Sequence, residues 1–222
     1  MQNLLLSANQ VLRSRDAAGA SGTLTRLRQL MGVLVAFGAV YGAVMGSFAG
    51  FSDLHWLQLF YSAVKVPLLL VLTFLVSLPS FFVLNTILGL RSDFGRVLRA
   101  LVWAQAGLTI VLASFAPFTL LWYASFSGYD NAVLFNAVMF GTASFAGQWI
   151  LRRLYVPLIA EHPRHRQLLW TWIVIYAFVG IQMGWILRPF VGDPRIRPQF
   201  FRQGMWGNAY EIVAQKVAKA IR

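Results

Sequence analysis

Residues 38–50 read GAVYGAVMGSFAG and place four glycines, Gly38, Gly42, Gly46 and Gly50, at a strict spacing of four. Glycine is a poor helix former in water, so a stripe of glycines on one helix face needs a special reason. Inside a membrane, small residues let two helix backbones approach closely, and this close packing drives helix association. The stripe, a glycine zipper, therefore predicts a tight contact along a membrane-spanning helix.

The stripe belongs to a series of long apolar segments. They cover about residues 29–50, 57–90, 98–124, 132–151 and 168–187. Each reaches the roughly 20 residues that a helix needs to cross a hydrocarbon core. The chain is 58% hydrophobic and 12% charged, which is about half the charged share of a soluble domain. We therefore expect an all-α, polytopic transmembrane helix bundle of about five spans.

The second segment, 57–90, is longer than one straight crossing needs, because it would extend roughly 50 Å as a helix. Pro67 and Pro79 are candidate break points, since proline removes a helical hydrogen bond. The sequence leaves open whether this segment tilts, projects, breaks or contains a re-entrant piece.

The connecting segments alternate in charge. Residues 1–28, 91–97 and 152–167 carry several arginines, whereas 51–56 and 125–131 carry no lysine or arginine. This is the positive-inside pattern. It places the N-terminus in the cytoplasm, and five crossings then place the C-terminus outside, although the tail itself is basic.

The chain divides into three parts. Residues 1–28 are expected to form a cytoplasmic amphipathic segment, 29–190 the five-helix transmembrane domain, and 191–222 a basic amphipathic tail. Apolar side chains recur at helical spacing in both end segments, as in helices that lie in the membrane interface. Each end helix packing on its own bundle is the alternative.

The fourth apolar segment has a small-residue face of its own, which includes Ala143 and Gly147. One hypothesis pairs this face with the glycine stripe within the chain. The other packs the stripe against a second copy of the chain, and a ring of such helices would surround a pore.

The chain offers little catalytic chemistry. It has no cysteine, and all seven carboxylates lie outside the apolar segments. A carboxylate relay within the membrane is therefore not expected, which argues against an enzyme and against a cation-coupled transporter. His162 and His165 with Glu161 are candidate metal ligands, but a solvated basic loop is the favoured interpretation. We expect no cofactor, no metal and no nucleic acid partner.

Lys65 is the one charged residue well inside an apolar segment. An ionisable residue at such depth is a functional-site candidate; the alternatives are that it snorkels outward or bonds the carbonyl that Pro67 frees. With the expected orientation, Lys65 and Arg188 lie in the same outer leaflet and are candidates for attracting an anion. Asp193 is a candidate ion-pair partner for Arg188.

Three stretches carry a resemblance to known proteins: AVKVPLLLVLTFLVSLPSFFVLNTILGLR, WAQAGLTIVLASFAPFT and GIQMGWILRPFVGDP. They resemble a family of uncharacterised bacterial polytopic inner-membrane proteins, which implies the inner membrane as location and no particular activity. The five-span layout is also loosely similar to the Yip1 family, in architecture alone, because the DLYGP-type segment of that family is absent.

The leading functional hypothesis is a non-enzymatic scaffold or accessory subunit that packs with itself or with partner membrane subunits. The first alternative is an oligomeric anion channel that uses Lys65 and Arg188. The second alternative is a membrane protein that binds an anionic lipid at the same cationic groups.

Overall fold

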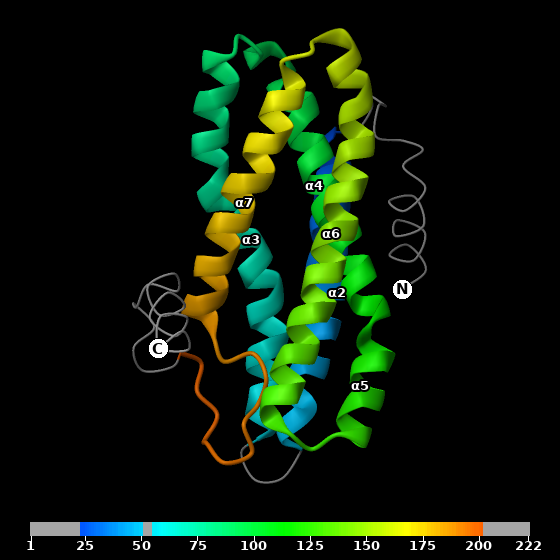
Figure 1. Ribbon diagram of the computed structural model, residues 1–222, viewed down its shortest axis with the longest axis vertical. Coiled ribbons are helices and arrows are strands. Elements are labelled where there is room, and N and C mark those ends of the chain that lie inside the picture. The colour runs from blue at the N-terminus through cyan, green and yellow to red at the C-terminus, as the bar shows by residue number, and fades with distance from the viewer. Residues whose placement is uncertain (1–22, 51–54, 202–222) are drawn as a thin grey trace, which may run out of the picture.

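The computed structural model describes residues 23–50 and 55–201. Its helices are α2 (Thr23–Gly46), α3 (Trp56–Ile87), α4 (Phe94–Ser114), α5 (Ala116–Ser125), α6 (Tyr129–Glu161) and α7 (His165–Leu187), with short 3-10 turns η1 (Ser47–Ala49) and η2 (Arg91–Asp93) (Figure 1). Within these described residues, five helical segments are long and apolar enough to cross a membrane. The expected all-α fold is confirmed, and the protein is a multi-pass integral membrane protein.

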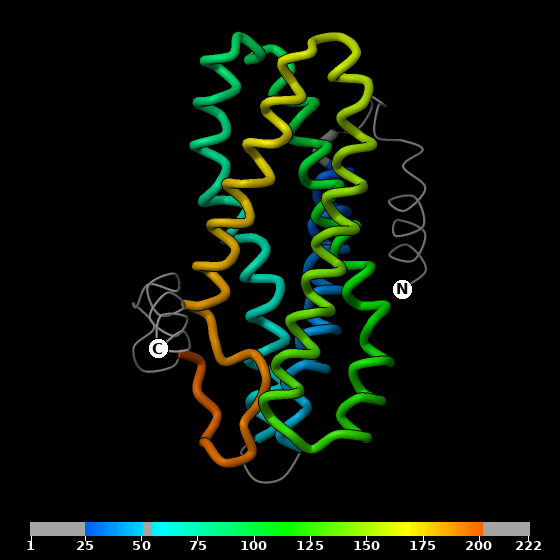
Figure 2. Tube along the Cα trace, in the orientation of Figure 1, coloured from blue at the N-terminus to red at the C-terminus, as the bar shows by residue number. Residues whose placement is uncertain are grey.

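The long helices run side by side along the long axis of the molecule, as the tube in Figure 2 shows. Helix α4 forms the centre, because every residue from 101 to 110 is buried. Helix α2 packs against α3 and α4, α6 packs against α4, and α7 packs against α3. Helices α6 and α7 therefore lie at the periphery, where large apolar side chains such as Phe145 and Phe178 are more than half exposed.

Helix α3 settles the question of the long second segment. It is one helix of 32 residues with both Pro67 and Pro79 inside it, so the segment contains no re-entrant piece. Pro67 is buried, and a Cβ atom on Gly38 of α2 would lie 3.4 Å from the Pro67 Cβ. Packing against neighbouring helices is what allows proline within a membrane helix.

The third apolar segment, expected over 98–124, belongs to one candidate span, Arg91–Ser125, but its helix is interrupted at Phe115. Helix α4 ends at Ser114, α5 begins at Ala116, and Pro117 lies in the first turn of α5. Proline has no N–H group for the preceding turn, which explains a new helix start at this point.

The glycine stripe packs against α3. A Cβ atom on Gly42 would lie 2.2 Å from the Ser62 carbonyl oxygen, and one on Gly46 would lie 2.5 Å from Leu59 Cα. Only glycine permits such a close approach of two backbones. The hypothesis that pairs the stripe with the fourth segment is wrong, because α3, the next helix in the chain, occupies this face.

The small face of α6 has a different partner. A Cβ atom on Gly147 would lie 3.0 Å from Leu108 Cβ of α4, and Ala143 is fully buried in the same cluster as Leu108. Gly50 was predicted as the last member of the packing stripe, and this prediction is wrong. Gly50 follows η1 with a φ of 81°, and a Cβ atom there would meet no atom within 4 Å. Gly50 thus serves a turn rather than a helix contact.

We name the two ends of the bundle by their contents. The arginine end contains the α3–α4 and α6–α7 connections, with Arg91, Arg96, Arg164 and Arg166. The strap end contains the start of α3, the start of α6 and the segment after α7, residues 188–201, which we call the strap. The amphipathic end segments were predicted over 1–28 and 191–222. Residues 1–22 and 202–222 lie outside the described residues, residues 23–28 belong to α2, and 191–201 are not helical.

Candidate functional site

The strap is folded into the bundle. It descends from the end of α7 beside α3 to the lower tip and turns back (Figure 1). Val191 is only 4% exposed. A Cβ atom on Gly192 would lie 2.7 Å from Ala49 Cβ and 3.1 Å from Gln58 Cγ. The first part of the strap is therefore packed directly against η1 and α3.

Polar side chains of α3 bind the backbone of the strap. Gln58 Nε2 donates hydrogen bonds to the carbonyl oxygens of Pro189, at 3.2 Å, and Phe190, at 3.4 Å. The Ser62 hydroxyl also donates to the Phe190 carbonyl. Irregular backbone within a membrane protein needs such internal partners, because lipid supplies none.

Lys65 is the third member of this polar face and is fully buried. Its Nζ donates to the carbonyl oxygens of Pro189, at 2.7 Å, and Gln199, at 3.4 Å. The Nζ atom also lies 5.0 Å from the centre of the Phe200 ring, within the range of a cation–π contact. Lys65 thus connects the beginning and the end of the strap. It lies roughly 14 Å along α3 from Trp56, the first residue of that helix, at a rise of 1.5 Å per residue.

The other two predicted site residues lie at the start of the strap. The Arg188 guanidinium carbon lies 3.3 Å from the centre of the Trp185 ring. The Asp193 carboxylate accepts a hydrogen bond of 3.0 Å from the backbone N–H of Arg195. This bond closes a turn in the strap, and the predicted ion pair between Arg188 and Asp193 stays a prediction.

A pocket of about 950 Å³ lies between the strap and the first turn of α6. Its volume falls in the range of small-molecule sites. The lining is polar, with Tyr129 and Asp130 from α6 and with Asp193, Arg195 and Arg197 from the strap. These residues come from segments that are far apart in the sequence, so only the folding of the strap against α6 brings them together.

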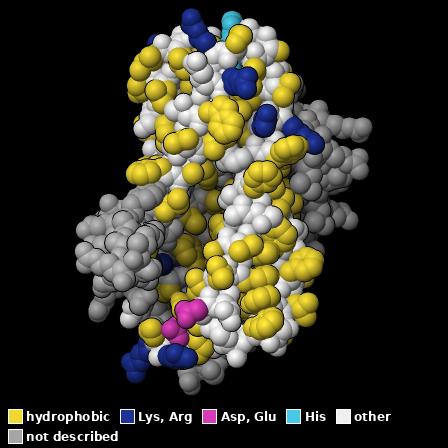
Figure 3. All heavy atoms as spheres, in the orientation of Figure 1, with side chains coloured by type: hydrophobic (Ala, Val, Ile, Leu, Met, Phe, Trp, Pro, Cys, Tyr) yellow, Lys and Arg dark blue, Asp and Glu magenta, His cyan; other side chains and the backbone are white. Residues whose placement is uncertain are grey.

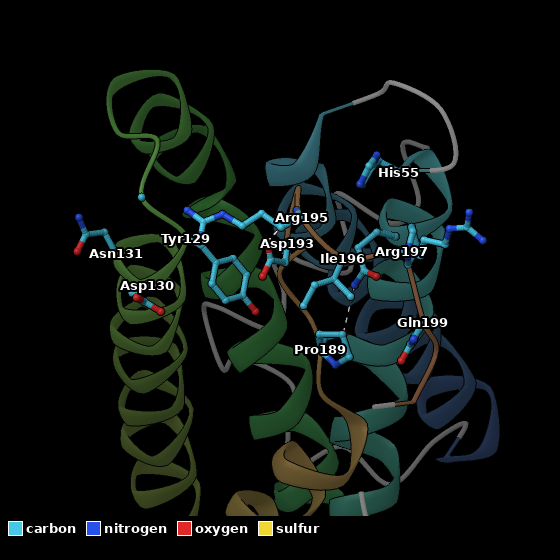
Figure 4. A pocket seen from close by; sticks show the side chains of 14 residues that line it. His55, Tyr129, Asp130, Asn131, Pro189, Asp193, Arg195, Ile196, Arg197 and Gln199 are labelled. Carbon is cyan, nitrogen blue, oxygen red and sulfur yellow. Dashed lines mark hydrogen bonds between the residues drawn. The ribbon is translucent and has the colours of Figure 1, made fainter. Parts of the chain in front are cut away.

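Figure 4 shows how the side chains of the pocket lie. The Tyr129 side chain and the Asp193 carboxylate point toward the same space, and Arg195 extends from the strap toward the start of α6. Arg195 and Arg197, the two arginines of the strap that line the pocket, are both exposed. The first N–H groups of a helix lack partners within that helix, and at α6 these groups belong to pocket-lining residues. The pocket therefore offers hydrogen-bond donors and positive charge, together with two carboxylates.

Buried polar residues also link the helices near the strap end. Tyr41 of α2 donates to Asn136 Oδ1 of α6 at 3.0 Å, and Asn136 Nδ2 donates to the Tyr123 hydroxyl of α5 at 2.6 Å. At mid-depth, the Tyr176 hydroxyl donates to Gln105 Oε1 at 2.9 Å. Interhelical hydrogen bonding is the usual role of such residues in membranes.

Ionic contacts tie the connections together at the arginine end. Arg96 binds both carboxylate oxygens of Glu161, at 2.5 and 2.7 Å, and His165 Nε2 lies 3.1 Å from Asp93 Oδ2. Within the described residues, no group of three or more His, Cys, Asp or Glu side chains is arranged to hold a metal ion. Glu161 and His165 instead contact the α3–α4 connection and the start of α4.

Comparisons with known proteins find no match. No family model, no curated protein and no solved structure matches the chain. The resemblance to bacterial inner-membrane proteins and to the Yip1 architecture therefore stays a prediction.

Sequence reasoning singled out Lys65 but missed Gln58 and Ser62. A signal was present, because positions 58, 62 and 65 share one face of a helix and carry the polar residues of an otherwise apolar stretch. The pocket had no such signal, since Arg195 and Arg197 are ordinary members of a basic tail when only the sequence is considered.

Proposed function

We propose that this protein is a non-catalytic membrane protein that binds the phosphate-bearing headgroup of a lipid in the pocket at the strap end. The observation that carries the proposal is the pocket of about 950 Å³ with Arg195 and Arg197 in its lining. Arginine matches the geometry of a phosphate group and can bind it with two parallel hydrogen bonds.

The position of the pocket supports a lipid ligand. It is built from the first residues of α3 and α6 and from the strap after α7. These are the ends of membrane-crossing segments, which is the level at which lipid headgroups lie. The positive-inside pattern predicts that this end lies outside the cytoplasm, and the proposed ligand is accordingly a lipid of the outer leaflet.

The contacts of Lys65 bear on the anion-channel alternative. Its ammonium group is directed at the strap carbonyls and is fully buried, which supports a structural role for Lys65 in holding the strap. A scaffold role is compatible with lipid binding, because a bound lipid can form part of an interface between membrane subunits. Neither the channel nor the scaffold alternative is supported by a structural feature as specific as the pocket.

Lipid retention tests the proposal. The protein is purified in mild detergent, and bound phospholipid is measured by native mass spectrometry. We expect retained lipid in the parent chain and a loss of most of it in the double variant Arg195→Gln and Arg197→Gln. The matched control, Arg152→Gln with Arg153→Gln, removes two exposed arginines of α6 far from the pocket and should retain lipid. Equal retention in both double variants, or no lipid in the parent chain, would refute the proposal.

A further inference from the structure

The charges in the pocket carry information about the headgroup. Besides Arg195 and Arg197, the lining includes the carboxylates of Asp130 and Asp193. A purely anionic headgroup would meet these carboxylates, and like charges brought together reduce affinity. A headgroup that carries both a phosphate and an ammonium group matches both kinds of side chain.

The arrangement separates the two kinds of charge. Arg195 extends toward the start of α6 (Figure 4), so a phosphate placed between them would receive hydrogen bonds from the guanidinium. The Asp193 carboxylate and the Tyr129 side chain point toward a shared space beside it. An ammonium group there would donate to the carboxylate and lie close to an aromatic ring, an arrangement that favours cations.

A hollow beside the pocket provides space for acyl chains. Figure 3 shows the surface hollowed between α6 and α7 in the lower half of the molecule, with hydrophobic side chains along it. A Cβ atom on Gly180 of α7 would lie 3.5 Å from Thr73 Cγ2 of α3, whereas one on Gly184, a turn later, would meet no atom within 4 Å. A side chain added at Gly180 would therefore touch α3, whereas one added at Gly184 would enter open space.

Resting on the proposed function, we infer that the ligand is a zwitterionic phosphate ester of the phosphoethanolamine type, with its phosphate at Arg195, its ammonium at Asp193 and its acyl chains in the hollow between α6 and α7. The same headgroup chemistry occurs in a diacyl lipid and in a soluble phosphate ester, and the hollow favours the lipid.

The test compares defined ligands on the purified, delipidated full chain. Calorimetry measures the affinity for short-chain phosphatidylethanolamine, for short-chain phosphatidylglycerol and for soluble glycerophosphoethanolamine. We expect phosphatidylethanolamine to bind at least about tenfold more tightly than phosphatidylglycerol, the effect of one charge-assisted hydrogen bond. Asp193→Asn should abolish this preference, and Arg195→Gln should lower the affinity for both lipids.

A second variant tests the hollow. Gly184→Phe fills the open space beside α7. It should lower the affinity for the short-chain lipid and leave the affinity for glycerophosphoethanolamine unchanged. Gly32→Phe on α2, where a Cβ atom also meets no atom within 4 Å, is the matched control and should change neither affinity. Thermal unfolding of each variant confirms that it is folded.

The outcomes separate this inference from the proposed function. Equal affinity for the two lipids, with both weakened by Arg195→Gln, would uphold headgroup binding and overturn the zwitterionic assignment. Equal affinity for the soluble ester and the short-chain lipid would overturn the assignment of the hollow to acyl chains. Binding of none of the ligands by folded protein would overturn both the inference and the proposed function.

Discussion

At the scale of single residues, Lys65 carries a positive charge into a helix that contains no acidic residue. The carbonyl oxygens of Pro189 and Gln199 accept its hydrogen bonds instead of a carboxylate. Carbonyl dipoles stabilise a buried ammonium, and the ammonium in turn satisfies backbone groups that lipid could not. Lys65, which the sequence indicated as a candidate for binding an anion, thus binds backbone carbonyls of its own chain.

Lys65→Met tests this role. The substitution leaves both strap carbonyls without their charged donor, at a cost of about 1.5–3 kcal/mol, so the strap should detach more often. Since the chain has no cysteine, Val191→Cys provides a single thiol at a buried strap position. We expect its labelling by a water-soluble maleimide to become at least about tenfold faster in the Lys65→Met background.

Ile196→Cys is the control for this experiment, because that side chain is already 51% exposed and should label at one rate in both backgrounds. An unchanged rate at Val191→Cys would show that Lys65 does not hold the strap.

At the scale of elements, Gly42 and Gly46 bring the backbone of α2 directly against the backbone of α3. The predicted close contact exists, and the Ser62 carbonyl oxygen lies only 2.2 Å from the position that a Cβ atom of residue 42 would take. Such an interface tolerates no added atom, because backbone cannot rotate away as a flexible side chain can.

Gly42→Ala and Gly32→Ala form a matched pair on α2. Alanine at position 42 should lower the free energy of unfolding by about 1–3 kcal/mol through overpacking. Alanine at position 32, which faces open space, should be neutral or slightly stabilising because alanine is the better helix former. Thermal unfolding in detergent compares them, and equal midpoints for the two variants would argue against the α2–α3 contact.

The polar link between α2, α5 and α6 makes a second prediction at this scale. Asn136→Leu removes the acceptor of Tyr41 and the donor to Tyr123, and should lower stability by about 0.6–1.7 kcal/mol, the range of hydrogen bonds between membrane helices. Thr142→Val on the same helix is the control, since that hydroxyl donates to the Val138 carbonyl one turn away. A control that is as destabilising as Asn136→Leu would refute an interhelical role.

At the scale of the whole molecule, the two ends of the bundle differ in charge. The arginine end contains the arginine-bearing α3–α4 and α6–α7 connections, whereas the connection over 125–131 at the strap end lacks lysine and arginine. The strap adds Arg188, Arg195 and Arg197 to that end, together with the carboxylate of Asp193. The positive-inside pattern predicts that the arginine end faces the cytoplasm. The pocket would then open outward.

Single cysteines at Ser92 and Ser127 measure this orientation. Both positions are exposed, and they lie at opposite ends. A membrane-impermeant maleimide added to intact cells should label Ser127→Cys and leave Ser92→Cys unlabelled until the cells are permeabilised. The reverse pattern would invert the topology and place the pocket in the cytoplasm.

Much of the fold could be predicted because its determinants are local. A run of about 20 apolar residues is enough to specify a membrane-crossing helix, since only a helix satisfies its own backbone groups in lipid. The outcome for the site was different. Lys65 was found from its charge alone, but its partners belong to a strap more than a hundred positions later in the chain.

The sequence by itself determined the all-α class, the number of apolar crossings and the face of α2 on which a helix must approach closely. It did so because apolar length and small-residue spacing are properties of one segment. The tertiary structure alone decided that α3 fills the glycine stripe, that Gln58, Ser62 and Lys65 hold the strap, and that the strap forms a pocket with α6. The residue pattern of one segment indicates what kind of surface can pack against it. Which segment packs there depends on how all the helices and the strap are arranged together.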